Sequence, residues 1–78
     1  MSEEQVKKIV EGYKIRLTPG SIFDFIEFKD NTLKIKFVCS DKTEFKVQGK
    51  KVTMEDEMKK QIEKYLKAKI NNVNVIFI

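Results

Sequence analysis

Residues 22–39 read IFDFIEFKDNTLKIKFVC, and this stretch decides the fold. Two runs rich in β-branched and aromatic residues, 22–29 and 32–39, flank the dipeptide Asp30-Asn31. Both side chains of this dipeptide tolerate positive φ, which the two-residue turn of a β-hairpin requires. The stretch therefore predicts an antiparallel hairpin whose turn fixes which residues lie opposite each other.

An uninterrupted ladder from this turn divides the hairpin into an apolar face and a solvent face. We assign to the core the cross-strand pairs Phe28–Leu33, Ile26–Ile35, Asp24–Phe37 and Ile22–Cys39. The solvent face then pairs Glu27–Lys34, Phe25–Lys36 and Phe23–Val38, and the first of these places opposite charges across the strands. One acidic residue, Asp24, fits this register poorly, and we expect its carboxylate to reach solvent at the end of the sheet.

Two amphipathic helices are predicted on either side of the hairpin. Residues 3–17 form the first, with Ser2 as N-cap, Gln5 in the capping-box position, and apolar residues at helical spacing: Val6, Ile9, Val10, Tyr13 and Leu17. The second begins after the N-cap Thr53 and ends near Asn71-Asn72. Its apolar stripe consists of Met54, Met58, Ile62, Tyr65, Leu66 and Ile70, and its i,i+4 ion pairs are Glu55–Lys59, Asp56–Lys60 and Glu63–Lys67.

Two further strands complete the prediction. Residues 43–48 alternate polar and apolar side chains, and a short loop would place them beside residues 32–39. Residues 73–78, VNVIFI, predict a final strand that needs cover on both faces. The expected fold is one small α+β domain over residues 1–78: helix, three-stranded antiparallel β-meander, helix and final β-strand, with the two helices packed on one sheet face.

The composition of the 78-residue chain excludes several classes of active site. There is no histidine, so the chain cannot supply a Ser-His-Asp triad, a Cys–His dyad or a His-ligated metal site. Cys39 is the only cysteine, which excludes an internal disulfide and a chelating thiolate pair. We predict no enzyme, no catalytic residue and no cofactor. Cys39 is the one candidate for metal or thiol chemistry, against the alternative of a small buried side chain at a strand end.

Cysteine usage and hydropathy bear on the compartment. A lone cysteine without a disulfide framework is typical of a reducing environment, so we expect a cytoplasmic protein. The acidic start of the chain, MSEE, differs from a secretory signal, and no apolar run approaches the roughly 20 residues that span a bilayer. No membrane partner is therefore expected.

Part of the chain resembles the C-terminal scaffold domain of NifU-type proteins. The resemblance lies in Ile15-Arg16, the Pro19-Gly20-Ser21 turn, the hairpin over residues 22–37 and the amphipathic helix from Met54. It implies a related fold. In that family a Gly-x-Cys-x-x-Cys motif after the second strand holds an iron–sulfur cluster. Here only Cys39 lies near that place, and Lys42 stands three residues later, so the resemblance does not imply cluster assembly.

Two surface features carry the functional hypotheses. Phe23, Phe25 and Val38 form a predicted apolar interaction patch on the solvent face of the hairpin. The possible basic strip, Lys34, Lys36 and Lys46, lies beside these phenylalanines, as in sheets that stack single-stranded bases. The net charge of +4 comes almost wholly from lysine, since Arg16 is the only arginine, and lysines mixed with acids are typical of solvated surfaces.

We therefore expect a non-enzymatic small binding or scaffold module that self-associates as a homo-oligomer or binds a protein partner. The alternatives are a nucleic-acid-binding domain that uses a lysine-rich sheet face, and a degenerate iron–sulfur assembly scaffold-like protein.

Overall fold

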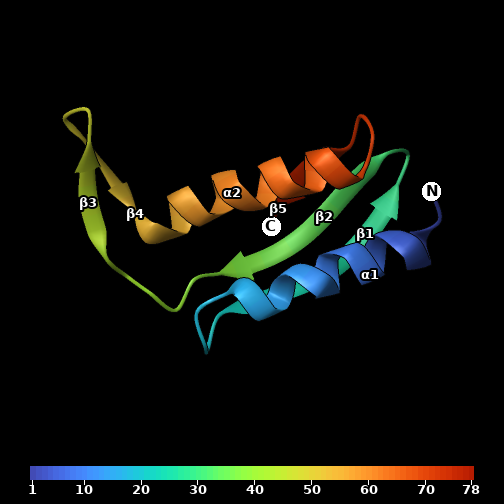
Figure 1. Cartoon of the computed structure of the whole chain (residues 1–78), viewed down its shortest axis with the longest axis horizontal. Coiled ribbons are helices and arrows are strands. Elements are labelled where there is room, and N and C mark those ends of the chain that lie inside the picture. Colours follow the sequence, from blue (N-terminus) through green and yellow to red (C-terminus); the bar gives the residue numbers. More distant parts are fainter.

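The computed structural model describes residues 1–78 as an α+β fold (Figure 1). Two α-helices, one 3₁₀ turn and five strands follow one another along the chain. They are α1 (Glu3–Tyr13), η1 (Lys14–Arg16), β1 (Ile22–Lys29), β2 (Thr32–Val38), β3 (Glu44–Val47), β4 (Lys50–Thr53), α2 (Met54–Lys69) and β5 (Asn74–Phe77).

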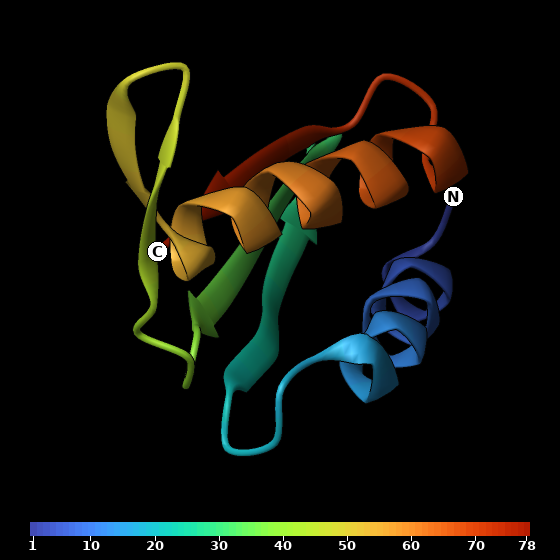
Figure 2. The ribbon, with the colours of Figure 1, turned by 60° about the vertical axis from the view of Figure 1, so that its left-hand side comes forward.

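The strands form two separate sheets. The main sheet has the order β1-β2-β5, with β1 antiparallel and β5 parallel to β2, while β3 and β4 form a two-stranded hairpin of their own. The predicted three-stranded antiparallel meander is therefore wrong in its third member. We call the β3–β4 hairpin the arm, because it stands away from the main sheet in both ribbon views (Figures 1 and 2).

Two local features explain why β5, rather than β3, pairs with β2. The Asp41 carboxylate accepts hydrogen bonds from the backbone N–H of Thr43 (2.9 Å) and from its hydroxyl (2.5 Å), which closes a turn just after β2. In addition, β5 places Val75 and Phe77 against the core, whereas β3 carries charged residues at alternate positions. The single free edge of β2 is occupied by the strand that buries more apolar surface.

The hairpin turn is confirmed. Asp30 and Asn31 both have positive φ, at 51° and 59°, and the predicted register holds next to them, where Phe28 faces Leu33 and Glu27 faces Lys34. The Asn31 side-chain amide also donates to the carbonyl of Asn71 (3.3 Å) and to that of Asn72, which joins this turn to the loop before β5.

Beyond Glu27 the register shifts by one residue. Ile26 is the extra residue of a β-bulge, so that Phe25 faces Ile35 and Phe23 faces Phe37. The shift turns Phe23 into the core and moves Asp24 to the opposite face, where it lies across from Lys36. The core pairs predicted for Ile26, Asp24 and Ile22 are therefore wrong.

Both helices pack on the same face of the main sheet, as predicted. One core cluster contains side chains from both helices and from the strands. Val6, Val10 and Tyr13 come from α1, Ile62 and Leu66 from α2, and Ile70 directly follows α2. The strands contribute Phe23, Leu33, Ile35 and Phe37. Phe23 meets Phe37 edge to face, with ring centroids 6.1 Å apart. Figure 2 shows α2 crossing in front of the three strands.

The starts of both helices follow the predicted signals. Ser2 and Gln5 form the expected capping box, and Thr53 accepts a hydrogen bond from Asp56 N–H at 3.1 Å. The first α-helix is shorter than predicted, because α1 ends at Tyr13 and continues as η1. Of the predicted ion pairs in α2, Glu55–Lys59 (3.6 Å) and Glu63–Lys67 (2.9 Å) form, whereas Lys60 pairs with Glu57 instead of Asp56.

Candidate functional site

The outer face of the main sheet, opposite the helices, is left without cover by the fold. Its apolar side chains come from all three strands and are between 37% and 46% exposed: Ile22, Ile26, Val38 and Ile76. By the strand registers, Ile22 lies across from Val38, and Ile76 lies beside Lys34. We call these four residues, together with the charged residues among them, the outer face.

The outer face carries charged side chains of both signs. Lys34 Nζ lies 3.4 Å from Glu27 Oε2, across the β1–β2 ladder. Asp24 and Lys36 also face each other across this ladder and are both exposed, but their side chains form no ion pair. The outer face thus presents Asp24, Glu27 and Lys29 on β1 and two lysines on β2; Lys29 faces the uncharged Thr32, and the Asp24–Lys36 pair is not engaged within the chain.

The apolar patch predicted from the sequence does not form. Phe23 is 2% exposed and belongs to the core, and Phe25 packs against that core, so only Val38 lies on the outer face. The bulge at Ile26 is the physical reason, because it reverses the facing of every residue between it and the start of β1. It brings Ile22 and Ile26 to the surface, which sequence reasoning had assigned to the core.

The predicted basic strip is divided between two sheets. Lys34 and Lys36 share the outer face of β2, but Lys46 lies on the arm, where it faces Lys51. No phenylalanine stands beside Lys34 and Lys36, since Phe23 and Phe25 face inward. A surface of lysines interleaved with aromatic rings is therefore absent from the main sheet.

The arm carries its own group of lysines. Three of them lie on its two strands, Lys46, Lys50 and Lys51, and Lys42 lies just before it. Only Lys51 is ion-paired, with its Nζ 2.9 Å from Glu44 Oε2. Like charges directly opposite each other destabilise a ladder, so the Lys46–Lys51 pairing is a local cost to the arm.

The only arginine is held by aromatic rings. The Arg16 guanidinium carbon lies 5.5 Å from the centroid of the Tyr13 ring and 5.2 Å from that of Tyr65. These cation–π contacts fasten η1 to α2.

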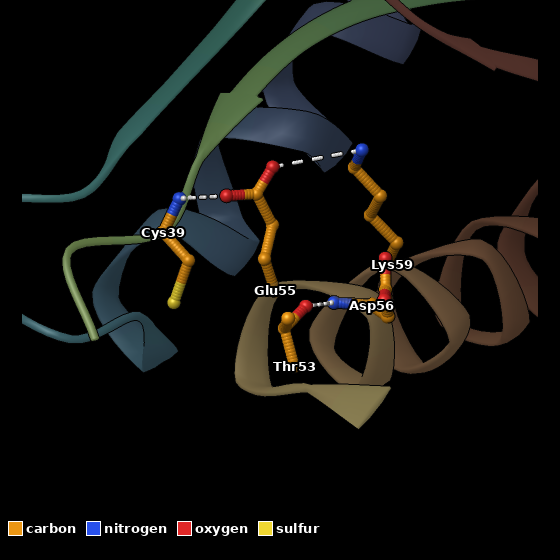
Figure 3. Close-up of polar contacts among 5 residues, drawn as sticks. All are labelled: Cys39, Thr53, Glu55, Asp56 and Lys59. Atoms are coloured by element: carbon orange, nitrogen blue, oxygen red, sulfur yellow. Dashed lines mark hydrogen bonds and ion pairs between the residues drawn. The ribbon is translucent and has the colours of Figure 1, made fainter. Parts of the chain in front are cut away.

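Cys39 is buried at the end of β2, with 1% of its surface exposed. Its backbone N–H donates to Glu55 Oε2 at 3.3 Å, and the other oxygen of this carboxylate lies 3.6 Å from Lys59 Nζ (Figure 3). The site therefore ties the end of β2 to the first turn of α2. No group of three or more His, Cys, Asp or Glu side chains is placed to hold a metal ion, and no pocket opens into the molecule.

One carboxyl group has a shifted pKa. The hydroxyl of Thr43, and then its backbone N–H, hold the pKa of Asp41 below its ordinary value, because both donate hydrogen bonds to the ionised form. Asp41 stands alone at the turn that leads to the arm, so the shift reflects a structural turn.

Comparisons with protein-family models, with curated proteins and with solved structures found no match to the chain. The resemblance to NifU-type scaffold domains thus stays a prediction from the residues that carry it. None of the helices has the length and apolar character that crossing a membrane requires.

Proposed function

We propose that this protein is a non-enzymatic binding or scaffold module that associates with itself through the outer face. The observation that carries the proposal is the group of half-exposed aliphatic side chains, Ile22, Ile26, Val38 and Ile76, on a sheet face that no helix covers. Sheets with one apolar face are stabilised when a second layer removes that face from water.

The size of the face determines the expected strength. β1 and β2 each run for about seven residues of about 3.3 Å, and β5 is shorter; with strands about 4.8 Å apart, the face measures at most roughly 14 Å by 23 Å. Two such faces in contact cover at most about 640 Å² in total, which is below the roughly 1,000 Å² of a stable specific interface. The expected dimer is therefore weak and depends on concentration, with a dissociation constant in the micromolar to millimolar range.

Sedimentation equilibrium from about 10 μM to about 1 mM tests the proposal, since it brackets that range of dissociation constants. The average mass of the natural protein is expected to rise toward that of a dimer, and Ile26→Glu is expected to abolish the rise. Ile15→Glu is the matched control, because Ile15 is 89% exposed on η1, away from the sheet. A natural protein that stays monomeric throughout would overturn the proposal.

A second candidate function is nucleic-acid binding through the arm. The observation that favours it is the group of arm lysines on a hairpin that stands away from the body, because Lys46 and Lys50 form no ion pair within the chain and a phosphate backbone would neutralise them. A two-stranded ribbon also has the width that the major groove of duplex DNA admits. The candidate surface thus moves from the main sheet, where the sequence placed it, to the arm.

Fluorescence anisotropy with a labelled duplex and a labelled single strand tests this candidate at several salt concentrations. If three arm lysines contact phosphates, the slope of log affinity against log salt is about −2.7 for a duplex. Lys46→Gln is expected to make the slope shallower by about 0.9, and Lys8→Gln, on α1, is expected to leave it unchanged. No binding at low salt would end this candidate.

A further inference from the structure

We propose a specific arrangement for the self-associated state, and this inference rests on the proposed function above. Two copies pack outer face to outer face about a two-fold axis that runs parallel to the strands, between β1 and β2. In this arrangement β1 of each copy lies over β2 of the other. The partner is therefore a second copy of this chain.

The charge pattern selects this axis from the alternatives. A two-fold axis along the strands places each outer residue of β1 in one copy over a β2 residue of the other copy. That β2 residue is the equivalent of its own cross-strand partner. Asp24 of one copy then lies over Lys36 of the other, and Glu27 lies over Lys34. Every charged contact across the interface joins opposite signs, and Ile22 meets Val38 in the same way.

Two other simple axes bring like charges together. An axis in the interface plane but perpendicular to the strands would place Asp24 over Glu27 and Lys36 over Lys34. An axis parallel to the strands but centred on β2 would place each lysine of β2 over its own copy. Like-charge contacts across an interface cost several kcal/mol and disfavour these two arrangements. An axis between β2 and β5 would place Lys34 over the uncharged Ile76 and leave the acids of β1 without a partner, so opposite charges meet only with the axis between β1 and β2.

The Asp24–Lys36 pair is the one that the interface can use. Lys34 is already paired with Glu27 at 3.4 Å, whereas Asp24 and Lys36 form no ion pair within the chain and are both exposed. Opposite charges at this position set the register of the two faces, while Ile22, Ile26 and Val38 on the two overlapping strands supply the apolar area that is removed from water. In this arrangement β5, with Ile76, lies beyond the overlap and stays exposed. The packed sheets would lie about 10 Å apart, as in other aligned sandwiches.

Charge reversal of this pair tests the arrangement. Asp24→Lys carries lysine at both positions and Lys36→Asp carries aspartate at both, so each variant repels its own copy but complements the other. We expect each variant alone to dimerise about tenfold more weakly than the natural protein, and an equimolar mixture to recover its affinity to within about threefold. Sedimentation velocity on each variant and on the mixture measures this.

Net charge and folding are controlled separately. Glu11→Lys and Lys8→Asp, both exposed on α1, change the net charge by the same amounts and are expected to leave dimerisation unchanged, alone or mixed. Urea unfolding of dilute samples shows whether each variant folds. If either reversal prevents folding, Glu27→Lys mixed with Lys34→Glu provides the same test at the neighbouring pair.

The outcomes separate the two proposals. Weakening of both variants with recovery in the mixture supports the arrangement. If the charge reversals change the affinity of the dimer no more than the α1 controls do, the arrangement is wrong but self-association stands. Edge-to-edge pairing of β5 would give this result. Weakening without recovery in the mixture also overturns it. A natural protein that never dimerises overturns the proposed function itself.

Discussion

Replacing Phe23 with alanine tests the bulge in β1, on which the outer face depends. Phe23 is 2% exposed and packs between Tyr13 and Phe37, with ring centroids 6.0 and 6.1 Å away. Truncation of a buried phenylalanine costs about 3–5 kcal/mol. A 78-residue chain has a total stability of about 4–12 kcal/mol at about 0.05–0.15 kcal/mol per residue, so Phe23→Ala should remove a large share of it.

Ile26 is the matched position, because it is 46% exposed at the bulge. Ile26→Ala should change the free energy of unfolding by less than about 1 kcal/mol, as for other exposed strand positions. Phe23→Leu, which keeps most of the volume, should cost less than about 1.5 kcal/mol and stay folded if the alanine variant does not. Urea denaturation followed by circular dichroism gives all three values.

An uninterrupted ladder makes the opposite prediction. It places Ile26 in the core opposite Ile35 and leaves Phe23 in solvent, so that Ile26→Ala would cost about 2–5 kcal/mol and Phe23→Ala little. A larger loss for Ile26→Ala than for Phe23→Ala would therefore refute the bulge, and with it the outer face.

Further predictions concern the polar contacts and the thiol. Cys39 should react with a thiol reagent in urea but only at a negligible rate in the native protein, because it is 1% exposed; rapid native labelling would contradict its burial. Glu55→Ala should lower stability by about 1–3 kcal/mol, since Cys39 N–H loses its acceptor, whereas Asp56→Ala should cost less than about 1 kcal/mol. The stabilising contribution of ionised Asp41 should be present above its unfolded-state pKa and be lost as the pH falls through the lower pKa of the folded state. Carboxyl NMR titration should show this pKa rising in Thr43→Val, which removes the hydroxyl donor, and an unchanged value would refute the assigned cause.

Local signals predicted much of the fold. The Asp30-Asn31 turn, the capping box at Ser2 and the N-cap at Thr53 each depend on residues that are close together in the sequence, and all three are confirmed. The apolar stripe of α2 was also predictable, because helical spacing alone places Ile62, Leu66 and Ile70 on one face.

Pairing between distant strands could not be predicted in the same way. Residues 43–48 and 73–78 both have strand-like patterns, and each could occupy the free edge of β2. Residues 73–78 pair with β2 because Val75 and Phe77 bury apolar area and because Asp41 forms a turn after β2. Neither effect can be inferred from the alternation of polar and apolar residues within a single segment.

The predicted apolar patch failed to form for one reason, the bulge, whereas the basic strip was divided because β3 does not join the main sheet. A bulge of one residue has no characteristic residue type that would reveal it in the sequence. The uninterrupted register is therefore correct at Glu27 but off by one residue at Asp24. The signal was present as a misfit: the ladder placed a carboxylate among apolar residues and two phenylalanines in solvent. A shift of one residue removes both misfits together.

The surplus residue in β1 also affects how this sequence can vary in length. Removing Ile26 would straighten the strand and leave every other side chain of β1 on the face that it occupies now. The central strand β2 has no such spare position, because its pairing with β5 is continuous from Thr32 to Ile35. Evolution can therefore lose a single codon at position 26, whereas the loss of one within residues 32–35 would turn part of the hydrophobic interior outward.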